Sequence, residues 1–223
     1  YLVITDPAAV CSPSTVDLTN STITTGSDTG LDLTYWTNIT ATTAITNPSA
    51  ISTSGTYYIK AKNTNGCLDI KPVNVTINPL PAVQTVSSIS YCQNEVTSVI
   101  NFTSNVTGTS FSWKNNDPSI GLSASGTGAI PSFTALNGGI TPIIATITVT
   151  STANGCIGAD RIFTITVNPT PSVDQPTNQE VCNGLPTAAI SFTGSITNTT
   201  YTWINSKPAI GLLASGTGDI PSF

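Results

Sequence analysis

An internal repeat is the feature of this sequence that most constrains its fold. Residues 91–133 align with residues 181–223 at a constant offset of 90 and without a gap, and 22 of the 43 aligned positions are identical. The longest shared stretch is IGLSASGTGAIPSF from Ile120, against IGLLASGTGDIPSF from Ile210. Self-similarity at a fixed period indicates tandem copies of one folding unit.

Two proline-rich segments mark the boundaries between the predicted copies. Residues 78–81 read NPLP and residues 168–171 read NPTP, at the same offset. Proline cannot donate to a strand ladder and stiffens a short connector, so each segment predicts a linker too short for free tumbling. We therefore expect domains at residues 1–79, 80–169 and 170–223, and refer to these ranges as modules one, two and three.

Modules one and three each differ from module two. Module one is a shorter, divergent relative, which shares Asn-Gly-Cys at 65–67 with the same tripeptide at 154–156 but lacks the long GTG stretch. Module three reaches only Phe223, which aligns with Phe133, so it lacks counterparts of the last two strands of module two. We expect the natural chain to continue with those strands and with a cysteine about 64 residues after Cys182, as in module two.

Alternating apolar and polar residues predict short strands. Residues 143–149 place Ile, Ala, Ile and Val at every second position, and residues 163–167 do the same with Phe, Ile and Val. Residues 1–5 also look like a strand. About seven strands in 90 residues is the spacing of an immunoglobulin-like sandwich. The predicted fold class is all-β, with tandem immunoglobulin-like sandwich domains of which the last is truncated.

Charge and composition exclude several classes of function. The chain has six Lys and Arg, a formal net charge of −5 and no His. It therefore lacks the basic face of a nucleic-acid binder and the commonest general base and zinc ligand. No apolar run is long enough to span a bilayer, so we expect no direct membrane insertion. We expect no catalytic residue, no cofactor and no metal site.

Five cysteines follow the repeats. Each complete module has one near its start and one in an Asn-Gly-Cys turn before its last strand. This pattern predicts one disulfide inside each module, Cys11 with Cys67 and Cys92 with Cys156, and leaves Cys182 unpaired. Disulfides imply an oxidising compartment. Metal ligation, reactive thiols and free buried cysteines are the competing interpretations.

Three further patterns have both a functional and a structural interpretation. Gly126-Thr127-Gly128 and its copy at 216–218 could cradle a phosphate, but no GK[ST] follows, so turns with positive φ are expected. Trp113 and Trp203 could stack on carbohydrate, but their alternating strands favour the core. The acid pairs Asp28 with Asp32 and Asp117 with Asp160 could bind Ca²⁺, yet no calcium-loop pattern surrounds them.

Modules two and three resemble the PKD-like, immunoglobulin-like repeats of large secreted proteins of Bacteroidetes. The resemblance depends on the Cys, Phe and Trp spacing, IGLxASGTGxIPSF, NGC and the TVNPxP ending. Module one resembles related immunoglobulin-like modules through VCSPSTVDLT, GTYYIKA and NGC. The resemblance implies giant cell-surface adhesins, including gliding-motility adhesins, which are typically exported by type IX secretion.

These observations together predict non-catalytic structural repeats of a long extracellular adhesin or fibre, associated with the outer membrane. Disulfides would staple this stalk, which would present binding regions elsewhere in the protein. The expected partners are neighbouring repeats of the same chain, surface glycans and other cell-surface proteins. Two alternatives stay open: accessory modules of a secreted polysaccharide-degrading enzyme, and a carbohydrate-binding module.

Overall fold

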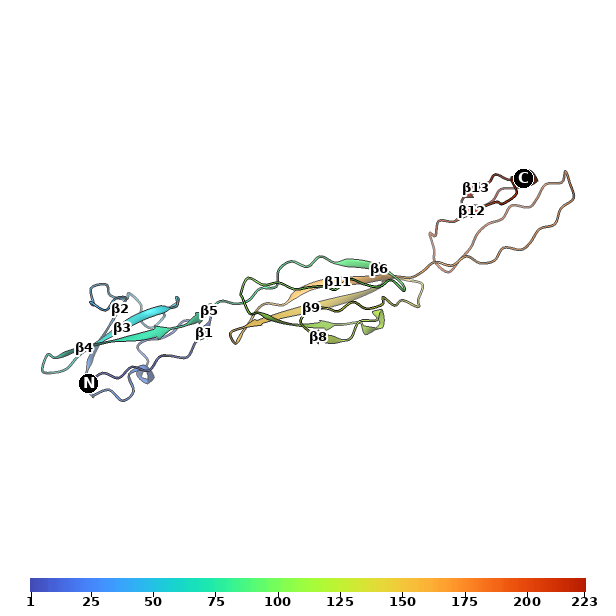
Figure 1. The fold of residues 1–223 in the computed structure, drawn as a ribbon. Helices are drawn as coiled ribbons and strands as arrows, with labels where there is room; N and C mark the ends of the chain where they lie inside the picture. Colours follow the sequence, from blue (N-terminus) through green and yellow to red (C-terminus); the bar gives the residue numbers. More distant parts are fainter. The chain divides into compact units, whose positions relative to one another are not determined.

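A computed structural model describes residues 1–223, and its regular elements are thirteen strands and three short 3-10 helices. The strands form four sheets, and each sheet lies within one predicted module. The all-β prediction is confirmed, and the modules are tandem immunoglobulin-like sandwiches (Figure 1). None of the short helices has the length and apolarity that a membrane span requires.

Module one contains a three-stranded antiparallel sheet and a separate parallel pair. The sheet has the order β2 (Asp32–Trp36), β3 (Gly55–Lys62) and β4 (Leu68–Val75). The parallel pair joins β1 (Val10–Cys11) to β5 (Ile77–Asn78), which follows β4 after one residue. The short helix η1 spans Ser21–Thr24. The core consists of Leu2, Val16, Leu18, Ile23, Ile51, Ile59, Ala61, Val73 and Val75.

The first five residues do not form the predicted strand. Leu2 is buried in the core, but its neighbour Val3 bonds to a side chain where a strand would pair with backbone. The Val3 N–H donates to Ser27 Oγ at 2.8 Å, and the Ser27 hydroxyl donates back to the Val3 carbonyl at 3.1 Å. Backbone bonds also join this segment to residues 23–28, since Thr5 N donates to Ile23 O at 2.9 Å and Asp28 N donates to Tyr1 O at 3.0 Å, but residues 1–5 are not in a strand.

Module two is built on one six-stranded sheet. The order is β6 (Ile89–Cys92), β11 (Arg161–Asn168), β9 (Ile143–Ala153), β7 (Ser110–Asn115) and β8 (Ser125–Thr127), with β10 (Cys156–Ile157) paired to β9. Figure 1 shows β6, β11 and β9 side by side. The helix η2 spans Pro118–Ile120. β6 runs parallel to β11, as β1 does to β5 in module one.

The predicted alternation within module two is confirmed. Ala145, Ile147 and Val149 of β9 are fully buried, and so are Ile165 and Val167 of β11. The second layer is less regular, because isolated bridges such as Ile100 to Ile130 hold it together in place of long strands. The remaining core residues of module two are Val83, Tyr91, Ile100, Phe102, Trp113, Ile120, Leu122, Ile130, Ala135, Ala153, Cys156 and Phe163.

Module three has fewer elements and a more open core. Its elements are β12 (Thr202–Ile204), β13 (Ser215–Thr217) and the helix η3 (Pro208–Ile210). Ile210 is 59% exposed, whereas the aligned Ile120 of module two is 0% exposed. Residues 170–223 contain no counterpart of β9 or β11, so a cleft of ≈ 820 Å³ opens where those strands lie in module two. Its apolar lining includes Ile190, Leu212, Ile220 and Phe223.

Contacts divide the chain into two compact units whose limits differ from the predicted modules. The first unit comprises residues 1–85, 101–112 and 149–161, and the second comprises 86–100, 113–148 and 162–223. The first unit takes in residues 149–161, the part of module two that carries Cys156. The module boundaries stay predictions.

Candidate functional site

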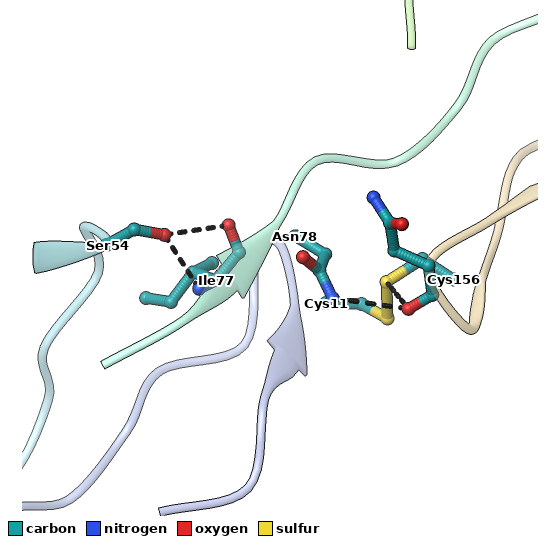
Figure 2. Close-up of a disulfide and its surroundings, with 6 residues drawn as sticks. Cys11, Ser54, Ile77, Asn78 and Cys156 are labelled. Carbon is teal, nitrogen blue, oxygen red and sulfur yellow. Dashed lines mark hydrogen bonds between the residues drawn. A yellow bond between two sulfur atoms is a disulfide. The ribbon is translucent and has the colours of Figure 1, made fainter. Parts of the chain in front are cut away.

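The most distinctive site in the chain is a disulfide between Cys11 and Cys156 (Figure 2). Cys11 ends β1, and Cys156 begins β10 directly after the turn at Asn154 and Gly155. The two Cα atoms lie 5.7 Å apart, within the usual range for a disulfide. Both turn residues have positive φ, 50° and 78°, which suits Asn-Gly in a two-residue hairpin. The bond therefore joins module one to a hairpin tip of module two.

Hydrogen bonds position both ends of this disulfide. The Ser12 N–H donates to the Asn78 carbonyl at 2.9 Å, which holds β1 against β5 beside the sulfur. The Asn78 side chain donates through Nδ2 to the Asn154 carbonyl at 3.2 Å (Figure 2). Ser54 fixes the neighbouring residue of β5, because its hydroxyl accepts from Ile77 N at 2.8 Å and donates to Ile77 O at 3.0 Å. Asn78 thus connects the two cysteine-bearing elements directly.

The linker after Asn78 also packs closely against module two. Pro81 is fully buried, and its carbonyl accepts a hydrogen bond from the buried Ser151 hydroxyl at 3.0 Å. A Cβ placed on Gly158 would lie 1.8 Å from the same carbonyl oxygen, so only glycine fits there. The disulfide and these contacts explain why residues 149–161 cluster with module one.

The predicted cysteine pairing is wrong. Cys11 bonds to Cys156 across the predicted boundary at 79/80, and Cys67 and Cys92 are free and exposed. The physical reason is the parallel pairing of β1 with β5, which places Cys11 beside the end of the last strand of module one. Cys67 lies before the start of β4, so the eight residues of β4, about 26 Å at 3.3 Å per residue, separate it from Cys11.

The same geometry keeps Cys92 from Cys156. Cys92 pairs in register with Asn168 at the end of β11, whereas Cys156 precedes the first residue of that strand. The eight residues of β11 again separate the two sulfurs by far more than a disulfide can span. Cys182 is free and exposed. The structure thus contains one disulfide where two were predicted, and its two cysteines lie in different predicted modules.

The GTG stretches form turns and also accommodate the tryptophans. Gly128 and Gly218 have φ of 70° and 72°, as predicted for a turn. The first glycine of each stretch has a different role, since a Cβ on Gly126 would lie 2.2 Å from Trp113 Cζ2. Gly216 meets Trp203 at the same 2.2 Å. Each tryptophan therefore lies flat on a glycine of the neighbouring strand, a contact that only a residue without a side chain permits.

Trp113 belongs to the core, in line with its structural interpretation. It is 4% exposed, and its Nε1 has no hydrogen-bond partner. Trp203 is half-buried, and its Nε1 is likewise buried and unpartnered. Neither ring lies open as a stacking platform in the way that carbohydrate recognition requires.

The candidate calcium acids serve local structure. Asp117 caps η2 by accepting from Ser119 N at 3.1 Å, and Asp160 accepts from the Thr150 hydroxyl at 2.5 Å. Asp28 pairs with the amino group of Tyr1, and Asp32 is an exposed residue of β2. No group of three or more cysteine or acidic side chains gathers in a way that could hold a metal ion.

Two ionisable groups have a shifted pKa. Burial raises the pKa of Tyr35 above its usual value, and the nearby charge of Asp17 adds to the shift. The pKa of Asp219 lies below its usual value because its carboxylate accepts hydrogen bonds from the Phe192 N–H and the Ser191 side chain. Both shifts therefore have causes in the local structure: burial and the charge of Asp17 for Tyr35, and hydrogen bonds for Asp219.

Several solved structures resemble the chain at low identity. Titin domains I67–I69 match at 14% identity over 81% of this chain and 70% of that one, with a TM-score of 0.45. Sidekick-1 immunoglobulin domains 1–4 match at 14% identity over 100% and 68% of the two chains, with a TM-score of 0.35. Murine CEACAM1b matches at 11% identity over 74% and 96%, with a TM-score of 0.38. No curated protein matches the sequence.

A family model matches part of the chain. It covers residues 7–81 and is described as the Flavobacterium inter-domain disulphide bond domain. Cys11 lies within the matched residues and its partner Cys156 lies outside them. The first part of the chain is thus similar to a family named for the kind of bond that the structure contains.

Proposed function

We propose that these modules are non-catalytic structural repeats of a long extracellular adhesin or fibre, in which disulfides between modules stiffen a stalk that presents binding regions. The observation that supports this proposal is the Cys11–Cys156 bond across the predicted boundary at 79/80. The bond links β1 of module one to the buried start of β10 in module two. It restricts the junction between them, which is what a spacer requires.

The chemistry of the bond also bears on location. Disulfides persist in oxidising compartments, so the proposed setting is extracellular, at the cell surface. The matched family carries the name Flavobacterium, which fits a surface protein of Bacteroidetes. PKD-like repeats, export by type IX secretion and a gliding-motility role are the finer parts of the proposal, and they rest on the sequence resemblance.

The surface composition suits a spacer with weak lateral contacts. Only 8% of the residues are charged, and Thr, Ser and Asn supply most of the polarity. Such a surface can form many single hydrogen bonds to glycans or to neighbouring surface proteins without a dedicated pocket. The proposed partners are therefore adjacent repeats of the same chain, surface glycans and other cell-surface proteins.

A replacement experiment separates a spacer from a binding module. In cells that display the parent protein, residues 1–223 would be exchanged for unrelated immunoglobulin-like domains of equal number and similar disulfide content. We expect adhesion to glycan-coated glass to stay within about twofold of the parent, whereas plain deletion of the modules should reduce it because the binding regions lie closer to the cell.

Two results would contradict the spacer proposal. Loss of adhesion in the exchanged protein, together with binding of purified residues 1–223 to a glycan array, would identify a ligand-binding module. Equal adhesion in all strains, with polysaccharide hydrolysis by the parent protein that drops when the modules are deleted, would identify accessory modules of an enzyme.

A further inference from the structure

Cys92 of module two occupies the same structural position as the bonded Cys11 of module one. Cys11 lies in parallel register with Asn78, and Cys92 lies in parallel register with Asn168. The residue after each cysteine donates its N–H to that asparagine carbonyl, Ser12 at 2.9 Å and Gln93 at 2.9 Å. Backbone direction, register and hydrogen bonding therefore agree at the two sites.

The two asparagines also begin equivalent linkers. Asn78 opens the NPLP segment and Asn168 opens NPTP. At the first linker, the Asn78 side chain donates to the Asn154 carbonyl of the turn that carries Cys156, so this residue helps to present the partner cysteine. Asn168 has the same side chain. It begins the second linker and lies in register with Cys92.

Unlike Cys11, Cys92 has a free and exposed thiol. The single cysteine of residues 170–223 is Cys182, which aligns with Cys92 itself and not with Cys156. In module two, the cysteine that bonds to the preceding module is Cys156. It lies in residues 134–169, and residues 170–223 have no counterpart of that segment. The site at Cys92 thus matches the site at Cys11, and residues 170–223 contain no Asn-Gly-Cys turn.

We propose that Cys92 forms a disulfide with the cysteine of an Asn-Gly-Cys hairpin turn in the module that follows it. The partner turn is the one supplied when module three is completed by a segment equivalent to residues 134–169. Each junction would then carry one disulfide, from the first strand of one module to the last hairpin of the next. This inference depends on the observed Cys11–Cys156 bond and would stand if the adhesive role proved wrong.

The chemistry of the step is a two-electron oxidation. The two thiols lose two protons and two electrons and form one sulfur–sulfur bond. A disulfide-type oxidant, either a small-molecule disulfide or an oxidised thiol–disulfide oxidoreductase, accepts the protons and electrons and leaves as two thiols. The exposed thiol of Cys92 is open to this exchange.

The test extends the chain with its own sequence. A copy of residues 134–169 would follow Phe223, which aligns with Phe133, so that module three gains both missing strands and one Asn-Gly-Cys turn. The protein would be folded in a glutathione redox buffer, alkylated, digested without reduction and analysed by mass spectrometry. We expect the Cys92 peptide to be linked to the cysteine of the appended copy, with Cys182 alkylated.

Each alternative pairing gives a different result. A link between the appended cysteine and Cys182 would overturn the proposal and restore one disulfide inside each module. Alkylated Cys92 together with an alkylated appended cysteine would also overturn it, provided that Trp203 fluorescence shifts to the blue and shows that module three has closed. The Cys11–Cys156 link serves as the positive control in the same digest.

A matched variant and the natural protein complete the test. In the extended chain carrying Cys92→Ser, the appended cysteine should stay free and should not transfer to Cys182. If the extended chain fails to close, the full-length protein shed from its native cells and alkylated at once decides the question. In that protein we expect less than about a tenth of Cys92 to be alkylated. Complete alkylation of Cys92 would contradict the proposal.

Discussion

At the scale of single residues, glycine determines how each tryptophan enters the core. Trp113 lies against the Cα of Gly126, and the aligned Trp203 lies against Gly216 in the same way. The shared GTG stretch therefore encodes two requirements, a close approach at its first glycine and a positive φ at its second. The sequence suggested only the turn, because the partner ring belongs to a strand more than ten residues away.

A substitution tests the close approach. We expect Gly126→Ala to lower the free energy of unfolding by about 1–3 kcal/mol, because the new methyl group overlaps a buried ring that has no room to move. Chemical denaturation followed by near-UV circular dichroism would measure the change. Gly138→Ala is the matched control, since a Cβ there meets nothing within 4 Å and should leave stability within about 0.5 kcal/mol.

Asp219 gives module three an acid whose pKa is shifted at a position where module two has no ionisable side chain. Its pKa is lower in the folded chain because the Phe192 N–H and the Ser191 side chain bond to the carboxylate. Its contribution to stability is therefore present above the unfolded pKa of about 3.9 and is lost as the pH falls through the folded value. Module two has Ala129 at this position.

An NMR titration checks this sign. We expect the amide signal of Phe192 to move with a midpoint below the ordinary Asp pKa, and Asp219→Asn to abolish that movement. The stability difference between the native chain and Asp219→Ala should shrink as the pH falls below about 4. A midpoint at or above the ordinary value would show that the carboxylate gains nothing from these hydrogen bonds.

At the scale of elements, β9 is the strand on which module two depends most. It pairs with β11 on one side and with β7 on the other, and it also pairs with β10 at its far end. Its inward residues are fully buried, and its outward residues are Ile144 and a series of threonines. One strand therefore joins the sheet together and supplies the middle of the core.

Two isoleucines of β9 test its two faces. We expect Ile147→Ala to lower the free energy of unfolding by about 2–5 kcal/mol, because it removes a fully buried side chain and leaves a cavity. Ile144→Ala is the control on the same strand, since Ile144 is 61% exposed and its truncation should cost less than about 0.5 kcal/mol. Urea denaturation of both variants would measure the contrast, and equal losses would mean that the assigned faces are wrong.

The strands could be predicted from the sequence because their pattern is local. The alternation in β9 and β11 needs only neighbouring residues, and burial follows it. The cysteine pairing could not be predicted in this way, because it depends on β1 and β6 lying parallel to the last strand of their module. The position of β1 against the last two strand residues of module one, far from Cys67, is a long-range contact. No local pattern indicates that contact.

At the scale of the whole molecule, the Cys11–Cys156 bond closes a loop with a sequence separation of 145 residues. In the chain-entropy model, a loop of this length stabilises the folded chain by about 5 kcal/mol. The double variant Cys11→Ser/Cys156→Ser should therefore unfold at a clearly lower denaturant concentration.

Free cysteines supply the control for this comparison. The variants Cys67→Ser and Cys92→Ser each replace an exposed, unbonded thiol. We expect each variant to have the same denaturation midpoint as the native chain. Midpoints would be compared in guanidinium chloride without reductant. A double variant as stable as these two single variants would show that the bond leaves the unfolded chain almost unconstrained.

The bond also decides which part of the chain can bear tension. Once the modules have opened, a pull on the two ends runs along residues 1–11, through the sulfur–sulfur bond and along residues 156–223, so the residues between the two cysteines lie off the covalent path of the load. Fully extended, a stretch of 145 residues would add about 500 Å to the length of the chain. That length stays stored while the bond is intact, even if both modules open. The disulfide therefore limits how far the opened chain can extend, and a reductant would release the residues between the two cysteines.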